Sequence, residues 1–362
     1  MDPKLPLGPT PPSESSSPTG VSPGDNVLQA AVRRMLQGAN LPADFTLHPL
    51  PGGGNNRVYR VSVDSGSLLL KVYFRHPGDQ RDRLKVEFDF TTFAWQHGVR
   101  QVPRPLAWDP VAGLGLFEFI DGRKLEPAEV DEAALSQALD FYRELNEFRR
   151  EPDAQALPAG SEACFCLFDH LDCVGARLAR CASWQPRTDL DRQAAEFVQT
   201  EVLPRWRQVQ DQVDAGVDRL ELSITWPLPP DWRRLSPSDF GFHNALMEAS
   251  SRIRFVDFEY AGWDDPAKLV CDFFCQPALP IPGRCWTMFL DEVTADLPGP
   301  ALERQRMELL LPVYRMKWVT ILLNDFQPAG NERRRFARPG VDPEQRKSEQ
   351  LAKAREYLAL IP

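Results

Sequence analysis

The feature that most constrains the fold is a change in the spacing of apolar residues near residue 121. Before it, residues 45–50, 57–64 and 67–74 form short segments rich in Val, Leu, Phe and Tyr, with glycines between them. Such segments are typical of strands joined by turns. After it, apolar residues recur every three or four positions over long stretches, which is typical of amphipathic helices. The sequence therefore predicts a small β-rich part followed by a larger helical part.

Two helices and two more strands complete the first part. Apolar spacing predicts helices over 26–37 and 81–98. Strands are expected over 105–110 and 113–120, with a turn between them. Residues 26–121 should therefore form an α+β unit built on an antiparallel sheet.

The second part, residues 122–362, is expected to be mainly helical. Asp131 and Thr188 stand at expected helix N-caps, and Pro204 should bend the helix that Thr188 begins. Residues 235–260 indicate a loop and a hairpin between helices. The helices are expected over 130–148, 188–213, 303–326 and 343–361.

Composition excludes several classes of protein. The hydrophobic content of 43% can bury a full core, and the net charge of −9 argues against a protein that binds nucleic-acid backbones. No segment approaches the ~20 apolar residues of a membrane span, so we expect a cytoplasmic protein. Residues 1–25 are rich in Pro, Ser, Thr and Gly and should form a disordered tail.

The seven cysteines fall into two groups, and the spacing of the first group fits no common zinc pattern. We interpret them as buried thiols in a reducing cytosol, with zinc binding as the alternative. They are Cys164, Cys166, Cys173 and Cys181, then Cys271, Cys275 and Cys285.

A glycine run, Gly52, Gly53 and Gly54, lies between two expected strands. Walker and dinucleotide motifs instead place glycines before a helix, so neither applies. A glycine hairpin can still lay backbone amides over phosphates without side-chain obstruction. The alternative is an ordinary flexible hairpin.

Lys71 ends an apolar run on the next expected strand, and Glu87 lies on the helix that follows. A charged residue in a buried strand needs a partner or a ligand, and Glu87 is a candidate partner. The alternative is a lysine on an edge strand that faces water.

Three oxygen-bearing side chains follow in the helical part. Asn244 comes five positions after Asp239, and Asp257 comes thirteen positions after Asn244. Phosphoryl transfer to a hydroxyl needs a carboxylate that accepts its proton and hard oxygen ligands for Mg²⁺. Asp239 suits the first role, and the other two suit the second. Alternatively, all three are turn or cap residues.

The order and spacing of these residues resemble the aminoglycoside phosphotransferase and choline kinase family, which is similar in fold to protein kinases. The resemblance covers roughly residues 45–330 and implies a two-lobed, kinase-like fold. It rests on Lys71, Glu87, "GGGNNRVYRV" with Asn56, "SDFGFHN", "VDFE", and "GWDDPAKLVCDFF" with Asp265, Pro266 and Asp272.

The resemblance also implies roles for the residues. Asp239 would be the catalytic base, with Asn244 and Asp257 as Mg²⁺ ligands. Lys71, held by Glu87, would contact the α- and β-phosphates of ATP. The glycine run and Asn56 match the family's nucleotide hairpin. The adenine would pair with the backbone of the connector residues Glu118, Phe119 and Ile120.

Two departures from the family pattern stand out. Pro237 occupies the position where the family usually has a His, and Glu259 replaces the last Gly of an Asp-Phe-Gly motif. With the altered glycine pattern of the hairpin, the second departure argues against a regulated protein kinase. His243 we interpret as a hydrogen-bonding residue that orients the loop of Asp239.

The acceptor site should lie in the helical part. Lys317 and Asn324 are seven positions apart, so they would project from nearly one face of the late helix. They are candidates to contact the acceptor, with Asp169 as a weaker one; alternatively, they face solvent or pair with other side chains. A free Lys317 would favour an anionic or hydroxyl-rich acceptor.

The sequence thus predicts an ATP- and Mg²⁺-dependent kinase of a small hydroxyl compound: a sugar, amino sugar, amino alcohol or aminoglycoside-like molecule. The alternative is a nucleotide-binding, catalytically silent module of the same fold.

Overall fold

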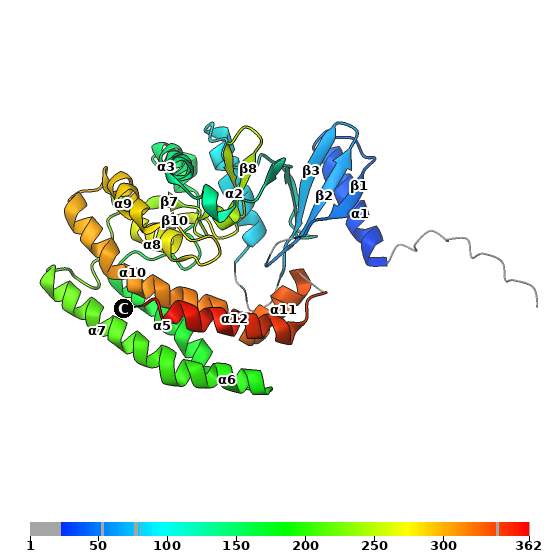
Figure 1. Cartoon of the computed structure of the whole chain (residues 1–362). Helices are drawn as coiled ribbons and strands as arrows, with labels where there is room; N and C mark the ends of the chain where they lie inside the picture. The colour runs from blue at the N-terminus through cyan, green and yellow to red at the C-terminus, as the bar shows by residue number, and fades with distance from the viewer. Residues whose placement is uncertain (1–22, 52–53, 76–78, 80, 338–339, 362) are drawn as a thin grey trace, which may run out of the picture.

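The computed structural model describes residues 23–51, 54–75, 79, 81–337 and 340–361. Most of the expected tail therefore lies outside the described residues. Helix α1 (Pro23–Gly38) begins inside the range expected for that tail. Two lobes follow, a sheet-based N-lobe and a helical C-lobe (Figure 1), which confirms the expected α+β, two-lobed fold.

The N-lobe is built on a five-stranded antiparallel sheet in the order β1-β2-β3-β5-β4. Side chains alternate across this sheet. Leu70 and Leu116 pack with α1 in one buried cluster, whereas Phe117 on the opposite face contacts Phe88 of α2. The elements are β1 (Thr46–Pro49), β2 (Arg57–Val63), β3 (Gly66–Val72), α2 (Arg83–Gln96), β4 (Pro105–Asp109) and β5 (Leu114–Glu118).

The C-lobe combines helices with two small antiparallel sheets, β6-β8-β9 and β10-β7. Helix α10 packs against α5, α7, α8 and α12. The strands are β6 (Gly122–Arg123), β7 (Arg234–Ser236), β8 (Ala245–Glu248), β9 (Ile253–Phe255) and β10 (Gly262–Asp264). The helices are α3 (Glu132–Glu147), α4 (Pro152–Gln155), α5 (Leu167–Ser183), α6 (Asp189–Phe197), α7 (Leu203–Arg219), α8 (Pro266–Cys275), α9 (Trp286–Thr294), α10 (Pro300–Leu322), α11 (Pro328–Ala337) and α12 (Pro343–Leu358).

The expected N-caps are confirmed. The side chain of Asp131 accepts a hydrogen bond from the amide of Ala134 at 2.9 Å, and Thr188 accepts one from Asp191 at 3.2 Å. A π-helical turn at Val198–Val202 separates α6 from α7 just before Pro204. The break thus lies near the expected bend.

Other expectations need correction. The late helix begins at Pro300 and its α-helical part ends at Leu322, where a 3-10 turn takes over. Helices α5, α8, α9 and α11 were not anticipated as helices. Helix α5 nevertheless carries a helical periodicity in its sequence, because the buried residues Leu167, Leu171, Val174 and Leu178 recur every three or four positions.

The cysteines are all unpaired, and five of the seven are buried. Within the described residues, no group of three His, Cys, Asp or Glu side chains is arranged to hold a metal ion. No helix in the same part of the chain combines the length and apolar character needed to cross a membrane.

Asp265 forms the charged centre of the C-lobe. It is fully buried at the start of α8, where it accepts a hydrogen bond from Arg306 of α10 at 2.8 Å and one from His170 of α5 at 3.1 Å. Burial alone would raise the pKa of Asp265, but Arg306 outweighs burial and holds that pKa well below its usual range. Three helices are therefore joined by one ionised carboxylate.

Replacing Asp265 should show how much its carboxylate contributes to the free energy of unfolding. Asp265→Asn removes one of the two carboxylates that pair with the buried Arg306, with Glu303 remaining at 2.7 Å. The variant should lower the free energy of unfolding at pH 7 by ~2–3 kcal/mol. Asp189→Asn, at a side chain that is 86% exposed, should cost less than ~0.5 kcal/mol. Urea titration measures both. Because the pKa of Asp265 is lowered, its contribution to stability is lost in acid. The difference in free energy of unfolding between Asp265→Asn and wild type should therefore shrink as the pH falls below ~4. A pH-independent gap would contradict this assignment.

Candidate active site

Lys71 lies inside the cleft between the lobes, not on a sheet edge. Strand β3 is central, and alternation turns Lys71 towards α2, where its Nζ pairs with Glu87 Oε2 at 2.6 Å and also with Asp257. Glu87 is held further by the hydroxyl of Tyr73 at 2.7 Å. Burial would lower the pKa of Lys71, but Asp257 and Glu87 outweigh it and raise that pKa above its ordinary value. Lys71 is therefore a fixed cation.

Asp239 lies on a short loop between β7 and β8. Its Oδ1 accepts a hydrogen bond from His243 Nε2 at 3.2 Å, and its Oδ2 accepts one from Asn244 Nδ2 at 3.1 Å. Burial would raise the pKa of Asp239, but these two donors lower it below its ordinary value. The carboxylate is therefore ionised at neutral pH, and His243 orients it as the sequence predicted.

Asp257 follows β9 in a left-handed backbone conformation, with φ of +74°. A non-glycine residue in that region is strained, and such strain gathers at functional sites. The amide of the preceding residue, Val256, donates to the carbonyl of Asn244 at 2.9 Å. Burial raises the pKa of Asp257, Lys71 opposes the rise, and Glu259 and Asp239 add to it. Asp239 and Asp257 are thus close enough to repel each other.

Two oxygen atoms here fit a magnesium ion. Asn244 uses its amide nitrogen to bind Asp239, which leaves its Oδ1 for a ligand. Asp257 binds Lys71 through Oδ1, and no hydrogen bond within the described residues engages its Oδ2. Mg²⁺ takes hard oxygen donors and few protein ligands. The donor set therefore suits Mg²⁺.

Glu259 links the glycine hairpin to this loop, a role the sequence did not reveal. Its fully buried carboxylate accepts hydrogen bonds from Asn55 and Asn56, both at 2.7 Å, and pairs with Arg83 at 3.0 Å. Asn56 in turn accepts from the amide of Phe74 at 3.1 Å. In the sequence, the only signal of this link is two asparagines beside the glycine run and an acidic residue two positions after Asp257.

The other predicted nucleotide contacts are only partly visible. Gly52 and Gly53 lie outside the described residues. In the connector, the amide of Glu118 donates to Arg104 O at 2.8 Å and its carboxylate binds Arg254 at 2.8 Å. The amide of Glu118 is therefore engaged within the protein, and so is the carbonyl of Ile120, which accepts a hydrogen bond from the amide of Gly122 at 3.0 Å.

The predicted acceptor residues already have partners in the protein. Lys317 is buried, and its Nζ pairs with Asp272 Oδ2 of α8 at 2.6 Å. Asp169 accepts hydrogen bonds from the amides of Phe165 and Cys166, so it caps α5. Asn324 lies in the 3-10 turn that continues α10, where its Oδ1 accepts a hydrogen bond from Gln327 Nε2 at 3.4 Å. The expectation of a free Lys317 is therefore corrected.

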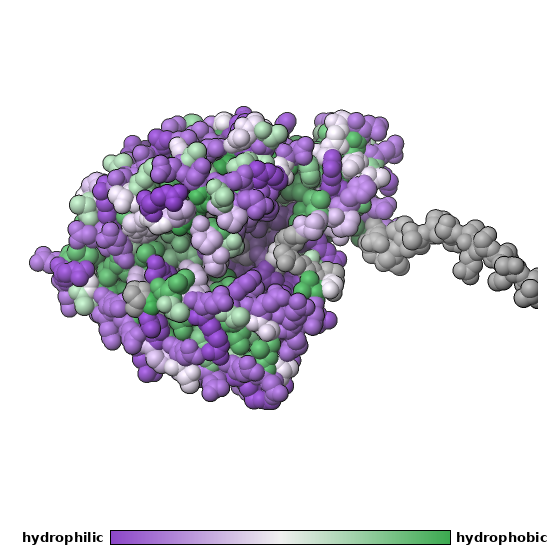
Figure 2. All heavy atoms as spheres, in the orientation of Figure 1, coloured by the Kyte–Doolittle hydropathy of each residue, from purple (hydrophilic) through white to green (hydrophobic). Residues whose placement is uncertain are grey.

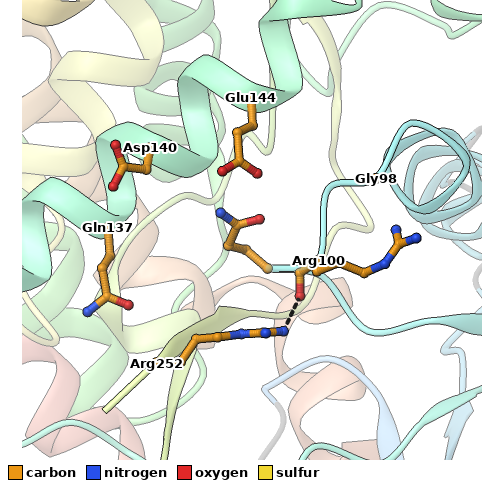
Figure 3. Close-up of a pocket in the computed structure, with 7 residues that line it drawn as sticks. Gly98, Arg100, Gln137, Asp140, Glu144 and Arg252 are labelled. Atoms are coloured by element: carbon orange, nitrogen blue, oxygen red, sulfur yellow. Dashed lines mark hydrogen bonds between the residues drawn. The ribbon is translucent and has the colours of Figure 1, made fainter. Parts of the chain in front are cut away.

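The cleft between the lobes is distinct from an open hollow elsewhere on the surface. Figure 2 shows a hollow between the lobes, walled mostly by hydrophilic residues. A separate hollow of about 410 Å³ lies between α3 and the β8–β9 turn and contains none of the candidate site residues. There the side chain of Arg252 donates to Arg100 O at 2.9 Å, as the dashed line in Figure 3 marks.

The fold and this constellation define a kinase-like phosphotransferase. The family model described as "Phosphotransferase enzyme family", abbreviated APH, matches residues 46–278. The chain belongs to this family, which confirms the resemblance. No curated protein matches the sequence.

Several solved structures share the fold. A choline/ethanolamine kinase family protein from Mesorhizobium loti is 20% identical, with a TM-score of 0.56 over 92% of this chain and 94% of that one. An ethanolamine kinase from Plasmodium vivax is 14% identical, with a TM-score of 0.58 over 93% and 90%. A spectinomycin phosphotransferase in complex with ADP and spectinomycin is 12% identical, with a TM-score of 0.55 over 90% and 98%. At these identities the likeness concerns the fold.

The Lys317–Asp272 pair can be tested by a double-mutant cycle. Lys317→Met and Asp272→Asn should each lower the free energy of unfolding by ~3 kcal/mol, since each leaves a buried charge unpaired. The double variant should lose less than the sum, with a coupling of ~1–3 kcal/mol. The exposed pair Asp140–Arg143 is the control, with coupling below ~0.5 kcal/mol. If the coupling energies of both pairs are near zero, Asp272 does not hold Lys317, and Lys317 becomes a candidate for acceptor contact again.

Proposed function

We propose that this protein transfers the γ-phosphoryl group of ATP, with Mg²⁺, to a hydroxyl of a small molecule. The proposal rests on one observation, that three charged side chains lie near one another in the cleft. Lys71 is a buried, fixed cation, Asp257 contacts it, and the ionised Asp239 lies close by. Family membership supports the reaction class.

Each residue then has a physical task. Lys71, oriented by Glu87, would bind the α- and β-phosphates. Asp239 would orient the acceptor hydroxyl and take its proton, because its lowered pKa keeps it ionised. Asn244 and Asp257 would hold Mg²⁺, which when bound offsets negative charge on the nucleotide phosphates. His243 and Asn244 keep Asp239 in one orientation.

The lobes would divide this work. Residues 26–121 would bind the nucleotide, through the glycine hairpin, Asn56 and the connector. Residues 122–362 would carry the catalytic loop and the acceptor site. The unpaired thiols fit a reducing cytoplasm, where ATP is at hand.

The acceptor would be a sugar, amino sugar, amino alcohol or aminoglycoside-like compound. Asp272 neutralises Lys317, so Lys317 creates no preference for an anionic acceptor, and cationic acceptors are equally compatible. Incubating the protein with γ-labelled ATP, Mg²⁺ and a panel of such compounds tests the proposal. Nucleotide binding without transfer to any of them would favour the silent module.

Asp239→Asn tests the base. The variant should lower kcat by about 10²-fold or more, because general-base catalysis contributes ~10²–10⁴-fold. Nucleotide affinity should survive. Asp140→Asn, on the exposed side of α3, should retain wild-type rates. Steady-state kinetics with the acceptor found by screening measures both, and a wild-type kcat for Asp239→Asn would refute the assignment.

Asp257→Ala tests the metal site. The variant should lose turnover at every Mg²⁺ concentration, because one of two hard oxygen ligands is gone. Calorimetric titration with Mg·ATP should show weakened binding, whereas Asp211→Ala on the exposed face of α7 should match wild type. Unchanged Mg·ATP affinity together with normal turnover would rule out Asp257 as a ligand.

A further inference from the structure

Lys124 is a cation beside the catalytic loop to which the proposed reaction gives no task. It directly follows β6, four positions beyond the connector residue Ile120. Its Nζ donates a hydrogen bond to the backbone oxygen of His243 at 2.7 Å. His243 directly precedes Asn244, one of the two residues proposed to hold Mg²⁺. The side chain of Lys124 therefore bridges the end of the connector and the catalytic loop.

The backbone on both sides of Lys124 is fixed. Strand β6 pairs with β8, and Gly122 packs so closely that an added Cβ atom would lie 3.0 Å from a backbone oxygen of β8. The side chain of Arg123 donates to Glu129 at 2.7 Å on the exposed surface. Leu125 is buried in the larger hydrophobic cluster. The backbone therefore holds the base of the Lys124 side chain beside the loop.

No carboxylate within the described residues pairs with Lys124, in contrast to three buried lysines. Lys71, Lys268 and Lys317 each pair with Asp or Glu side chains. An ammonium group has three N–H donors, and Lys124 uses one of them for the backbone of the catalytic loop. Lys124 therefore brings a positive charge that no carboxylate contact offsets.

The surroundings of the amine suit an anionic ligand. The residue as a whole is exposed, so a ligand can reach it, whereas partial burial of the amine against the loop lowers the pKa of Lys124. The charge of Asp257 opposes that fall, so the two charges lie within electrostatic reach of each other. A nucleotide with its base at the connector and its Mg²⁺ at Asn244 and Asp257 would pass between these two places, where Lys124 lies.

We propose that Lys124 binds the phosphate chain of the nucleotide through its uncompensated charge. The inference rests on the proposed function for the identity of the ligand. Lys71 is paired with two carboxylates, so Lys124 supplies net positive charge that the Lys71 cluster does not. A hydrogen bond between an ammonium and a phosphate is roughly twice as strong as one between neutral groups. Lys124 lies outside the motifs that indicated the family, so the family pattern did not reveal it.

The test compares Lys124→Met, which removes the charge, with Lys124→Arg, which keeps it. Arg123→Met is the matched control, because it removes one charge from the neighbouring residue, whose side chain binds Glu129 instead. Calorimetric titration with Mg·ATP should show affinity reduced about tenfold or more in Lys124→Met. Lys124→Arg should stay within about threefold of wild type, and Arg123→Met should match it. Affinity for adenosine, which has no phosphates, should be equal in all four proteins when measured by competition with ATP.

Two results would overturn the inference while the proposed function stands. One is an ATP affinity of Lys124→Met equal to that of Arg123→Met. The other is an equal loss of affinity for ATP and for adenosine in Lys124→Met, which would mean that Lys124 only supports the catalytic loop through His243. Wild-type protein that binds no ATP would instead defeat the proposed function, and the Lys124 contact with it.

Discussion

The buried ion cluster around Lys71 is the interaction on which the arrangement of the lobes depends. One ammonium group contacts Glu87 of α2 and Asp257 of the C-lobe, with the side chains of Lys71 and Glu87 almost fully buried. Removing charges from water is costly, and the cost is recovered only when each charge is paired. The pairing therefore fixes β3, α2 and the loop after β9 relative to one another. It also presents a cation and a carboxylate where a nucleotide phosphate and its metal ion would meet.

Glu259 connects the end of the glycine run to the ion cluster around Lys71. Two residues after Asp257, it gathers Asn55, Asn56 and Arg83 around one carboxylate. Burial would raise the pKa of Glu259, but Lys71 and Arg83 hold it below its ordinary value. A glycine at this position, as in protein kinases, could not supply that anion. The departure from the protein-kinase pattern is thus a different way of attaching Asn55 and Asn56, at the end of the glycine run, to the loop after β9.

Charge pairing also governs the helical lobe. Asp265 with Arg306 and Asp272 with Lys317 tie α8 to α10, and α8 lies directly behind the catalytic loop through the packing of Phe273 on Phe240. Lys317, which the sequence suggested as a ligand contact, instead pairs with Asp272 and holds two helices together. Lys317 therefore offers no free cation to the proposed acceptor site.

The sequence by itself determined the features whose causes are local. Short apolar segments separated by turn residues placed the five strands of the N-lobe, and side-chain caps placed the helix starts at Asp131 and Thr188. The order of Lys71, Glu87, Asp239, Asn244 and Asp257 indicated the family. Only the tertiary structure decided which distant residues meet. Asn56 and Glu259 are 203 positions apart, and Arg57 and Phe336 are 279 apart. No periodicity reports such contacts, because they depend on how the two lobes pack, and the pairing of Lys317 with Asp272 depends on the same packing of helices.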